Sequence, residues 1–335
     1  MTIDRSSLLI DESTVRQLIK MEDAIPLLDQ LFKEIGQGQV INPDKVTLDL
    51  GESGGWPFHE GFLNAMPAYL GSVKVAGQKF VGGFAGDRAK AGLPYINALI
   101  ILVDGQLGNF ISVMDGTRIS NMRTGVQAAL AAHYILNKKT ISVGVFGAGQ
   151  QARQLVHAIT CLFELEDLYV YDISQDHANR FKDDMTPFVQ GNIHIVKTAE
   201  EACHADAIFT LTPAQEPIIK ADWVQAGTLV FPMGSYREVE DELILNADAI
   251  VVDHVSQALN RGILKPLYHE GVITEDHIRG TFGQLAIGED LLLKPKEQRI
   301  ICIPIGMGAA DVCLANEVYQ RALKDNLGTR FNFTD

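Results

Sequence analysis

The second part of the chain alternates short apolar runs with stretches of helical spacing. An apolar run over 141–146 is followed by apolar residues at helical intervals over 155–162, and by a second apolar run that ends before Asp172. Further short apolar runs lie at 193–196, 207–211, 228–231, 250–252 and 299–304. This alternation predicts an α/β fold with a Rossmann-type doubly wound parallel sheet. The stretch 263–293 is irregular, and we predict no element there.

The first third of the chain has a different pattern. A short strand is expected at 8–10, and two amphipathic helices follow, the second over 23–35. From 45 to 114 the apolar runs are short and interrupted by glycines, which is typical of a mostly antiparallel sheet. This part therefore predicts an α+β domain.

Two more helices are expected around the parallel sheet. Thr124 and Gln127 have the spacing of a capping box, so a helix is predicted to begin there and to run through Leu136. Near the end of the chain, Asp311 opens an amphipathic helix as a partner of its dipole. The tail after this helix is polar and is expected to be loose.

A glycine motif follows the strand at 141–146. It reads Gly147-Ala148-Gly149-Gln150-Gln151-Ala152. The first glycine allows a tight turn, the second lets the backbone approach a pyrophosphate, and a small third residue lets the helix pack closely on the strand. A turn that holds no ligand is the alternative, but the flanking strand and helix favour a dinucleotide.

The second strand of this motif indicates which dinucleotide binds. Asp172 ends that strand, where a carboxylate can accept the ribose hydroxyls and would repel a 2′-phosphate. We therefore predict NAD as the cofactor, held by Gly147, Ala148, Gly149, Gln150, Gln151 and Asp172, with Thr124 and Thr212 as further contacts.

Composition limits the possible partners. The 335 residues are 47% hydrophobic, enough for two buried cores, and the net charge of −14 argues against nucleic acid or an anionic membrane. The N-terminus does not resemble a signal peptide, and no apolar run has membrane length. The four cysteines have no metal-ligand spacing, so we expect reduced core thiols, no metal site and a cytoplasmic protein.

Three cations are candidates for binding an anionic substrate. Arg123 stands just before the expected helix start, where a cation opposes the dipole, so either a bound anion or a salt bridge to an acid such as Asp115 is expected. Lys79 lies in a run that otherwise reads as buried, and burial would lower its pKa toward the acid/base range. A position on an edge strand of the sheet would explain Lys79 equally well. Lys45, taken alone, reads as a solvated charge.

Several segments together resemble the ornithine cyclodeaminase and mu-crystallin family. They are Met66-Pro67-Ala68-Tyr69, Lys79-Phe80-Val81, Gly92-Leu93-Pro94, Val113-Met114-Asp115-Gly116, Arg123-Thr124, the Gly147 loop and 306–312. The resemblance implies a homodimer. Residues 1–125 and 305–335 would form the substrate-binding and dimerisation domain, and 126–304 the NAD-binding Rossmann domain.

The resemblance also implies a chemistry. Hydride would move between the nicotinamide and the α-carbon of a small amino or imino acid, with Lys45, Lys79 and Arg123 holding the substrate carboxylate. Lys79 and Arg123 are the expected catalytic residues, and Lys79 would also transfer a proton at the substrate nitrogen. The family more usually has arginine at the position of Lys45, and a lysine replaces a bidentate fork by a point charge.

The sequence departs from the family pattern at one place that bears on the substrate. Family members carry an aspartate after a glycine pair that handles the second amine of ornithine, whereas this chain reads Pro-Met-Gly-Ser-Tyr-Arg-Glu over 232–238. Glu238 is the candidate substitute. We therefore favour an NAD-dependent imino acid reductase or amino acid dehydrogenase. Ornithine cyclodeaminase, an opine-like reductive coupling, and a non-catalytic crystallin-like protein that binds a ligand together with the dinucleotide remain alternatives.

Overall fold

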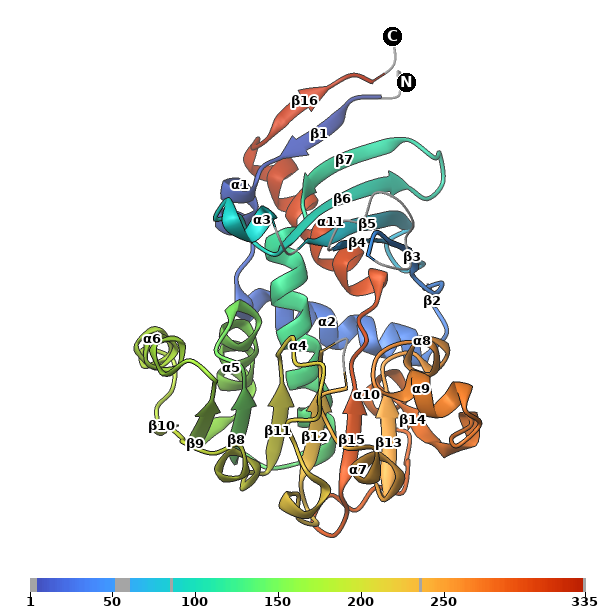
Figure 1. The fold of residues 1–335 in the computed structure, drawn as a ribbon. Helices are drawn as coiled ribbons and strands as arrows, with labels where there is room; N and C mark the ends of the chain where they lie inside the picture. The colour runs from blue at the N-terminus through green and yellow to red at the C-terminus, as the bar shows by residue number, and fades with distance from the viewer. Residues whose placement is uncertain (1–4, 52–60, 85–86, 235–236, 334–335) are drawn as a thin grey trace. The chain divides into compact units, whose positions relative to one another are not determined.

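The computed structural model describes residues 5–51, 61–84, 87–234 and 237–333 (Figure 1). The position of Ser235, where the family aspartate is missing, lies outside these residues. The chain forms two compact units, one made of 1–123 and 307–335 and the other of 124–306. It passes from one unit to the other twice, once inside helix α4 (Thr117–Leu136) and once just before helix α11 (Gly308–Asp325).

The described residues of the first unit form an eight-stranded sheet in the order β16-β1-β7-β6-β5-β4-β2, with β3 also paired to β4. The strands are β1 (Ser7–Ile10), β2 (Val40–Ile41), β3 (Val46–Asp49), β4 (Gly61–Leu70), β5 (Val75–Phe84), β6 (Ile96–Asp104), β7 (Phe110–Asp115) and β16 (Thr329–Phe331). Every ladder is antiparallel except that of β1 with β7. The mostly antiparallel sheet is confirmed.

The predicted loose tail is wrong. Strand β16 pairs with β1 in antiparallel register, Leu8 opposite Arg330. The outer backbone groups of β1 offer hydrogen bonds that the tail takes up. Sequence periodicity cannot detect such a three-residue strand.

The helices of the first unit include α11, which covers one face of its sheet. They are α1 (Glu12–Leu18), α2 (Met21–Gly36), α3 (Asp87–Lys90), the start of α4, and α11. Helix α11 packs on β4, β5 and β6. Met66, Ile100 and Leu102 are buried beneath it, whereas Phe80 and Leu99, which alternate to the other face of the sheet, stay exposed.

Helix α4 begins seven residues earlier than predicted, at Thr117 rather than Thr124. The carboxylate of Asp115 accepts hydrogen bonds from the amides of Thr117 and Arg118 at 3.1 and 3.2 Å, and so caps the helix. The capping box at Thr124 is therefore wrong. Arg123 lies in the second turn, so the argument that it opposes the helix dipole is wrong as well.

The second unit contains an eight-stranded sheet, parallel throughout, in the order β10-β9-β8-β11-β12-β15-β13-β14. Its strands are β8 (Thr140–Phe146), β9 (Glu164–Tyr171), β10 (Asn192–Ile195), β11 (Ala207–Thr210), β12 (Leu229–Pro232), β13 (Ala249–Val252), β14 (Ile278–Thr281) and β15 (Ile300–Ile303). The doubly wound sheet is confirmed. The strand order reverses between β8 and β11, where this architecture binds ligands.

The sheet of the second unit is flanked by the rest of α4 and by further helices: α5 (Gln150–Leu162), α6 (Gln175–Met185), α7 (Asp241–Leu245), α8 (Val255–Asn260), α9 (Leu264–His269), α10 (Phe282–Ala286) and the 3-10 turns η2 (Glu200–Cys203), η3 (Ala221–Trp223) and η4 (Glu275–His277). The stretch that sequence reasoning left unassigned holds α9, η4, β14 and α10. These short elements are below the length at which helical periodicity becomes visible.

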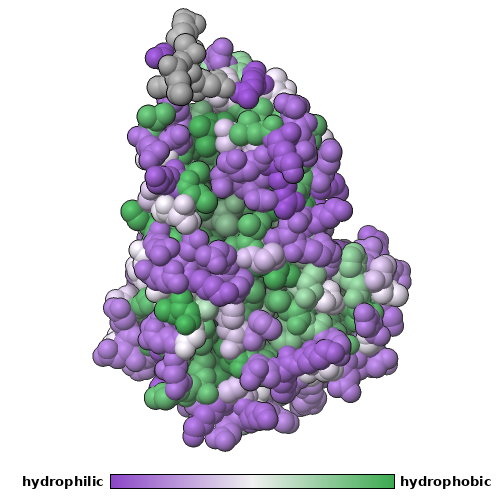
Figure 2. Space-filling model, turned by 180° about the vertical axis from the view of Figure 1, so that it is seen from behind, coloured by the Kyte–Doolittle hydropathy of each residue, from purple (hydrophilic) through white to green (hydrophobic). Residues whose placement is uncertain are grey.

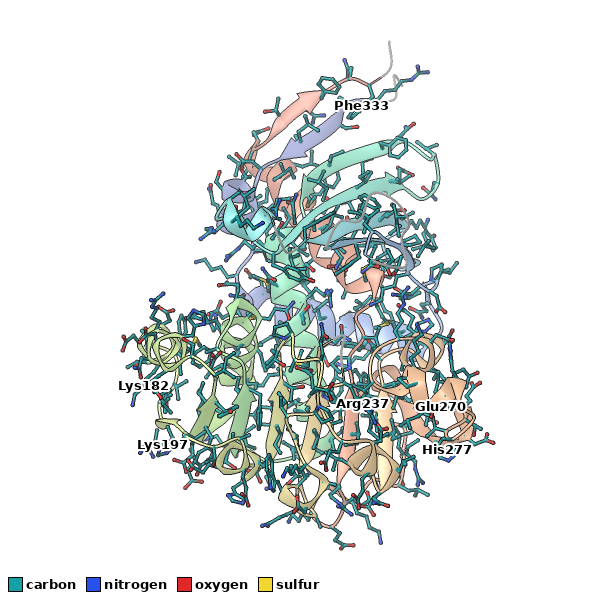
Figure 3. All side chains as sticks on the ribbon, viewed as in Figure 1. Lys182, Lys197, Arg237, Glu270, His277 and Phe333 are labelled. Atoms are coloured by element: carbon teal, nitrogen blue, oxygen red, sulfur yellow. The ribbon has the colours of Figure 1, made fainter. Side chains whose placement is uncertain are left out.

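Charged side chains cover the outside of the second unit. Lys182, Lys197 and Glu270 project from its periphery in Figure 3. On the face shown in Figure 2, polar side chains predominate and apolar ones reach the surface between them. None of the helices in the described part of the chain combines the length and apolarity needed to cross a membrane.

Candidate active site

The glycine motif forms the loop between β8 and α5 at the carboxyl end of the parallel sheet (Figure 1). Gly147 has φ of +94°, and a Cβ there would lie 2.7 Å from the carbonyl oxygen of Leu211. Only glycine fits this position. Ala152 is fully buried where α5 lies against the sheet. The loop therefore has the geometry of a pyrophosphate cradle, with the first amides of α5 available as donors.

Sequence reasoning missed Arg153, which supports this loop from behind. Its Nη1 donates to the carbonyl oxygens of Ala148 and Gly149 at 2.5 and 3.1 Å. Asp184 accepts from its Nε at 2.8 Å, and the guanidinium stacks over Phe181. By binding the loop's carbonyl groups, Arg153 fixes the orientation of the peptide planes in the cradle. A cation in the first turn of a helix, where it opposes the dipole, was the available signal.

Asp172 follows directly after β9, as predicted. Its Oδ2 accepts from the amide of Ala148 at 2.7 Å, and its Oδ1 accepts from the amide of Ser174 at 2.8 Å. The carboxylate is thus held against the glycine loop, and each oxygen retains a lone pair for a further donor. This is the arrangement that a pair of ribose hydroxyls requires.

The half-buried Thr212 and the buried Glu238 form a hydrogen-bonded group beyond β11. The carboxylate of Glu238 accepts from Thr210 Oγ1 at 2.6 Å, from Thr212 N and Oγ1 at 2.8 and 2.7 Å, and from Gly234 N at 2.7 Å. Both donors of Thr212 are therefore used, which leaves its methyl group and carbonyl oxygen for a cofactor. Glu238 is fully buried and ties together the segments after β11 and β12.

Thr124 lies beside the dinucleotide helix. A Cβ on the next residue, Gly125, would come within 2.7 Å of the backbone of Gln154 and Leu155, so α4 and α5 approach each other closely here. The amino end of α5 is the part that faces a bound phosphate. This contact is compatible with the cofactor role predicted for Thr124.

Two of the three predicted substrate residues, Lys79 and Arg123, belong to a buried ionic cluster. The ammonium of Lys79 lies 2.8 Å from Asp311 Oδ2 and donates to Ser120 Oγ at 3.0 Å. The Nε of Arg123 donates to Asp311 Oδ1 at 3.2 Å. Lys79 and Asp311 are completely buried, whereas about 10% of the Arg123 side chain is exposed. The cluster therefore meets its surroundings at the guanidinium.

The structure decides between several alternatives for these residues. Strand β5 is flanked by β4 and β6, so Lys79 is not an edge-strand lysine. Arg123 is paired with Asp311 rather than with Asp115. Asp311 is in the first turn of α11, as expected, but its carboxylate serves the two cations. Sequence reasoning missed this role because the three members of the cluster come from three separate elements, β5, α4 and α11.

Burial changes the proton affinity of the cluster. Loss of solvent, assisted by the nearby charge of Arg123, lowers the pKa of Lys79 from 10.5 to about 8, and the carboxylate of Asp311 opposes this shift. A lysine whose pKa lies near neutrality can both donate and accept a proton under physiological conditions.

Lys45 is half-buried in the loop between β2 and β3. Asn42 in the same loop accepts a hydrogen bond from the amide of Ala309 at 2.9 Å, which ties the loop to the first turn of α11. Lys45 thus belongs to the same end of the sheet as Asp311. Arg88 donates to the carbonyl of Pro94, and Lys90 is exposed; both residues belong to the short helix α3.

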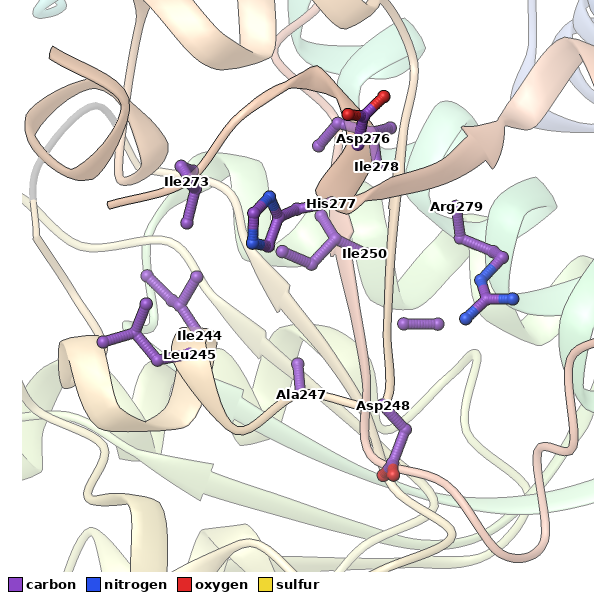
Figure 4. A pocket seen from close by; sticks show the side chains of 11 residues that line it. Ile244, Leu245, Ala247, Asp248, Ile250, Ile273, Asp276, His277, Ile278 and Arg279 are labelled. Carbon is purple, nitrogen blue, oxygen red and sulfur yellow. The ribbon is translucent and has the colours of Figure 1, made fainter. Parts of the chain in front are cut away.

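A pocket of about 470 Å³ opens elsewhere in the second unit, at the amino ends of β13 and β14 (Figure 4). Asp248, Asp276, His277 and Arg279 line its rim over an isoleucine floor. It lies at the end of the sheet opposite to the glycine loop. Ligands of doubly wound sheets bind beyond the carboxyl ends of the strands, so this pocket is not the dinucleotide site.

The cysteines only partly match the prediction. Cys203 and Cys302 are buried and Cys313 is half-buried, but Cys161 on α5 is exposed, so a core position for all four is wrong. All four are free thiols. Burial raises the pKa of Cys203 and Cys313 to about 12, and that of Cys302 further.

The parallel sheet, its glycine loop and Asp172 define a protein with a Rossmann-type dinucleotide-binding unit, joined to a unit with a buried lysine–aspartate–arginine cluster. The chain belongs to the ornithine cyclodeaminase/mu-crystallin family, whose model matches residues 6–326. An alanine dehydrogenase of Archaeoglobus fulgidus is 32% identical over 330 residues, covering 98% of both chains. A Delta(1)-pyrroline-2-carboxylate reductase of Bacillus cereus is 25% identical, over 97% of this chain and 100% of the relative.

Solved structures agree with these matches. The Thermococcus litoralis Delta(1)-pyrroline-2-carboxylate reductase, in complex with NADH and L-proline, superposes with a TM-score of 0.87 at 29% identity, over 96% of this chain and 99% of that one. An archaeal alanine dehydrogenase dimer with bound NAD superposes with a TM-score of 0.88 at 30% identity, over 98% and 100%. Both the fold and the family prediction are confirmed.

Proposed function

We propose that the protein is an NAD-dependent oxidoreductase that interconverts a small L-amino acid and its imino acid. The observation that carries this proposal is the buried cluster of Lys79, Asp311 and Arg123 in a chain that also has a dinucleotide loop. A binding protein would gain little from a buried ammonium whose pKa is near 8. The related alanine dehydrogenase and pyrroline-2-carboxylate reductase support the same class of reaction.

The substrate carboxylate binds to the exposed edge of the guanidinium. Arg123 uses its Nε for Asp311, and its Nη2 donates to Ser120 Oγ at 3.5 Å, so the remaining terminal N–H groups would bind the carboxylate. Lys45, from the loop tied to the start of α11, supplies a second positive charge. These contacts would orient the α-carbon in the same way for the amino acid and the imino acid.

Lys79 transfers the proton at the substrate nitrogen. Two of its three N–H donors are directed to Ser120 and Asp311, which leaves one for the substrate. In the reductive direction the ammonium gives a proton to the nitrogen, and in the oxidative direction the neutral amine takes it back. Asp172 and the Gly147 loop would hold the dinucleotide, whose reduced form would supply the hydride and whose oxidised form would accept it.

The environment of Glu238 in the second unit argues against a diamine substrate. Glu238 was the candidate for the second amine of ornithine, but its carboxylate is buried and accepts four hydrogen bonds from Thr210, Thr212 and Gly234. We therefore place the substrate among small monoamino acids and cyclic imines, such as pyruvate with ammonia or Δ1-pyrroline-2-carboxylate.

The test is NADH oxidation, followed by absorbance, against 2-oxo acids with ammonia and against cyclic imines, with ornithine assayed in parallel for proline. We expect turnover with an imine and none with ornithine. Proline formed from ornithine without net oxidation of NADH would contradict the proposal. So would tight NADH binding with no turnover of any substrate.

We propose further that the protein is a homodimer formed through the open face of the first sheet. Phe80, Leu99 and Phe110 are 44, 54 and 58% exposed on this face, which α11 does not cover. An apolar sheet face of this kind is typical of a subunit interface. Leu99→Glu should give a monomer in analytical ultracentrifugation. Val272→Glu, an equivalent change at an exposed position of the second unit, should leave the dimer intact.

We also propose a cytoplasmic location, supported by the four free thiols. Fractionation of cells that produce the protein checks this directly.

A further inference from the structure

Asp253 is a buried carboxylate outside the groups assigned to the reaction above. It follows β13 at the carboxyl end of the parallel sheet and is 2% exposed. Its amide donates to the carbonyl of Ile303 at 3.2 Å, which fixes its backbone to the end of β15. Burying a carboxylate is costly unless donors compensate its charge, so its partners indicate why it is there.

One oxygen of Asp253 holds two separate elements. Its Oδ2 accepts from Gln127 Nε2 at 2.5 Å and from the amide of Gly306 at 2.6 Å. Gln127 is completely buried in α4, and Gly306 has φ of +89° directly before the start of α11. Both donors therefore converge on a single acceptor atom.

The two elements are those through which the chain passes between its units. The passages lie at 123/124 in α4 and at 306/307 before α11. Arg123 stands one helical turn before Gln127 on the same face of α4. Asp311 follows Gly306 by five residues, in the first turn of α11. Asp253 thus fixes the second-unit ends of both segments that carry members of the ionic cluster.

We propose that Asp253 is a positioning residue for the reaction. By joining Gln127 and Gly306 at one atom, it fixes the rotation of α4 and the conformation of the glycine turn before α11. It thereby keeps the side chains of Arg123 and Asp311 in their positions relative to each other. The inference rests on the proposed function. A displacement of about 1 Å at a reacting group can lower a rate up to a hundredfold, so this register matters for catalysis.

The variants that test it are Asp253→Ala, Asp253→Asn and Asp206→Ala. Asparagine keeps an acceptor oxygen for both donors, whereas alanine removes it. Asp206 is the matched control, because its carboxylate also accepts from a backbone amide, that of Ser142 at 2.9 Å, but at the amino end of β8. The readouts are Tm, the KM of the imino acid, the Kd of NADH from its fluorescence, and the amide exchange rate of Gly306.

We expect Asp253→Ala to raise the KM of the imino acid about tenfold and to accelerate amide exchange at Gly306, while the Kd of NADH stays unchanged. In Asp253→Asn, the KM of the imino acid and the exchange rate at Gly306 should both stay close to those of the unmodified protein. Asp206→Ala should lower Tm and leave the KM and the Gly306 exchange rate as they are in the unmodified protein.

Equal effects of the two alanine variants on KM and exchange would overturn the proposal, because they would show general destabilisation. An Asp253→Ala variant that weakens NADH binding and leaves the imino acid KM unchanged would overturn it too. The exchange rate at Gly306 is read without any substrate. If the unmodified protein reduces no imine, the proposed function fails, and the hydrogen bond of Asp253 is still tested on its own.

Discussion

Replacing Asp311 by asparagine tests how the cluster sets the proton affinity of Lys79. Burial and Arg123 lower this pKa to about 8, and Asp311, 2.8 Å from the ammonium, is the group that keeps it from falling further. A hydrogen bond to a charged group contributes about 1.5–3 kcal/mol. At about 1.4 kcal/mol per pH unit, its loss should lower the pKa of Lys79 to about 6–7.

The assay is the pH dependence of kcat/KM for imine reduction, in which Lys79, as the proposed proton donor, would have to be protonated. Activity of the unmodified enzyme should fall above about pH 8, and in Asp311→Asn the fall should begin one to two pH units lower. Titration of the free imine is common to both enzymes and cancels. Asp23→Asn, which removes a carboxylate 3.0 Å from Arg321 in the same unit, is the control and should leave the profile in place.

If kcat/KM of Asp311→Asn is lower but falls at the same alkaline pH as that of the unmodified enzyme, the proposed effect of Asp311 on the pKa of Lys79 is refuted. That result would show that the titrating group is not Lys79, or that Asp311 does not act on it.

Four further predictions concern the cluster, the cofactor and the thiols. Folding lowers the pKa of Lys79 from 10.5 to about 8, so the charged lysine destabilises the fold below pH 8. The free energy of unfolding should therefore rise by about 3 kcal/mol between pH 8 and 10.5, relative to that of Lys79→Met. Urea-denaturation profiles of the two proteins that stay parallel over this pH range would contradict this. Arg123→Ala should raise the KM of the imino acid about 10–100-fold through the loss of charge-assisted hydrogen bonds, with NADH fluorescence titrations unchanged; an unchanged KM would remove Arg123 from the site. Asp172→Ala should reduce the preference of kcat/KM for NADH over NADPH at least about tenfold, and an unaltered ratio would show that Asp172 does not select the cofactor. Ellman's reagent should label one thiol, Cys161, in the native protein and four after denaturation, since burial raises the pKa of the other three; more than one fast thiol would contradict the burial of the others.

The dinucleotide half could be predicted because its signals are local. The Gly147 loop, the apolar strands on either side of it, and Asp172 at the end of β9 all lie within about thirty residues, and strand and helix periodicity place them in order. Arg153 was missed because a cation in the first turn of a helix is only a weak signal, which does not show which groups the guanidinium contacts.

The cluster of the first unit could be predicted only in part. The apolar run around Lys79 indicated its burial, but its partner Asp311 comes from the other end of the chain, and no local pattern joins them. Arg123 was chosen on a wrong premise, since Asp115 begins α4 two turns earlier. Its assignment to the substrate then depended on the family resemblance. The ladder of β16 with β1 is likewise a contact between the chain ends.

The most direct test of the account is the fate of hydride from labelled cofactor. The protein is incubated with NADH that carries deuterium at C4 of the nicotinamide, on each face in turn, together with the imine that is turned over, and the product is analysed by mass spectrometry and NMR. If hydride passes directly to the α-carbon, one of the two labelled cofactors gives an L-amino acid with one deuterium, located at the α-carbon, and an equal amount of NAD. An amino acid without deuterium from either cofactor, or deuterium at another carbon, would contradict it.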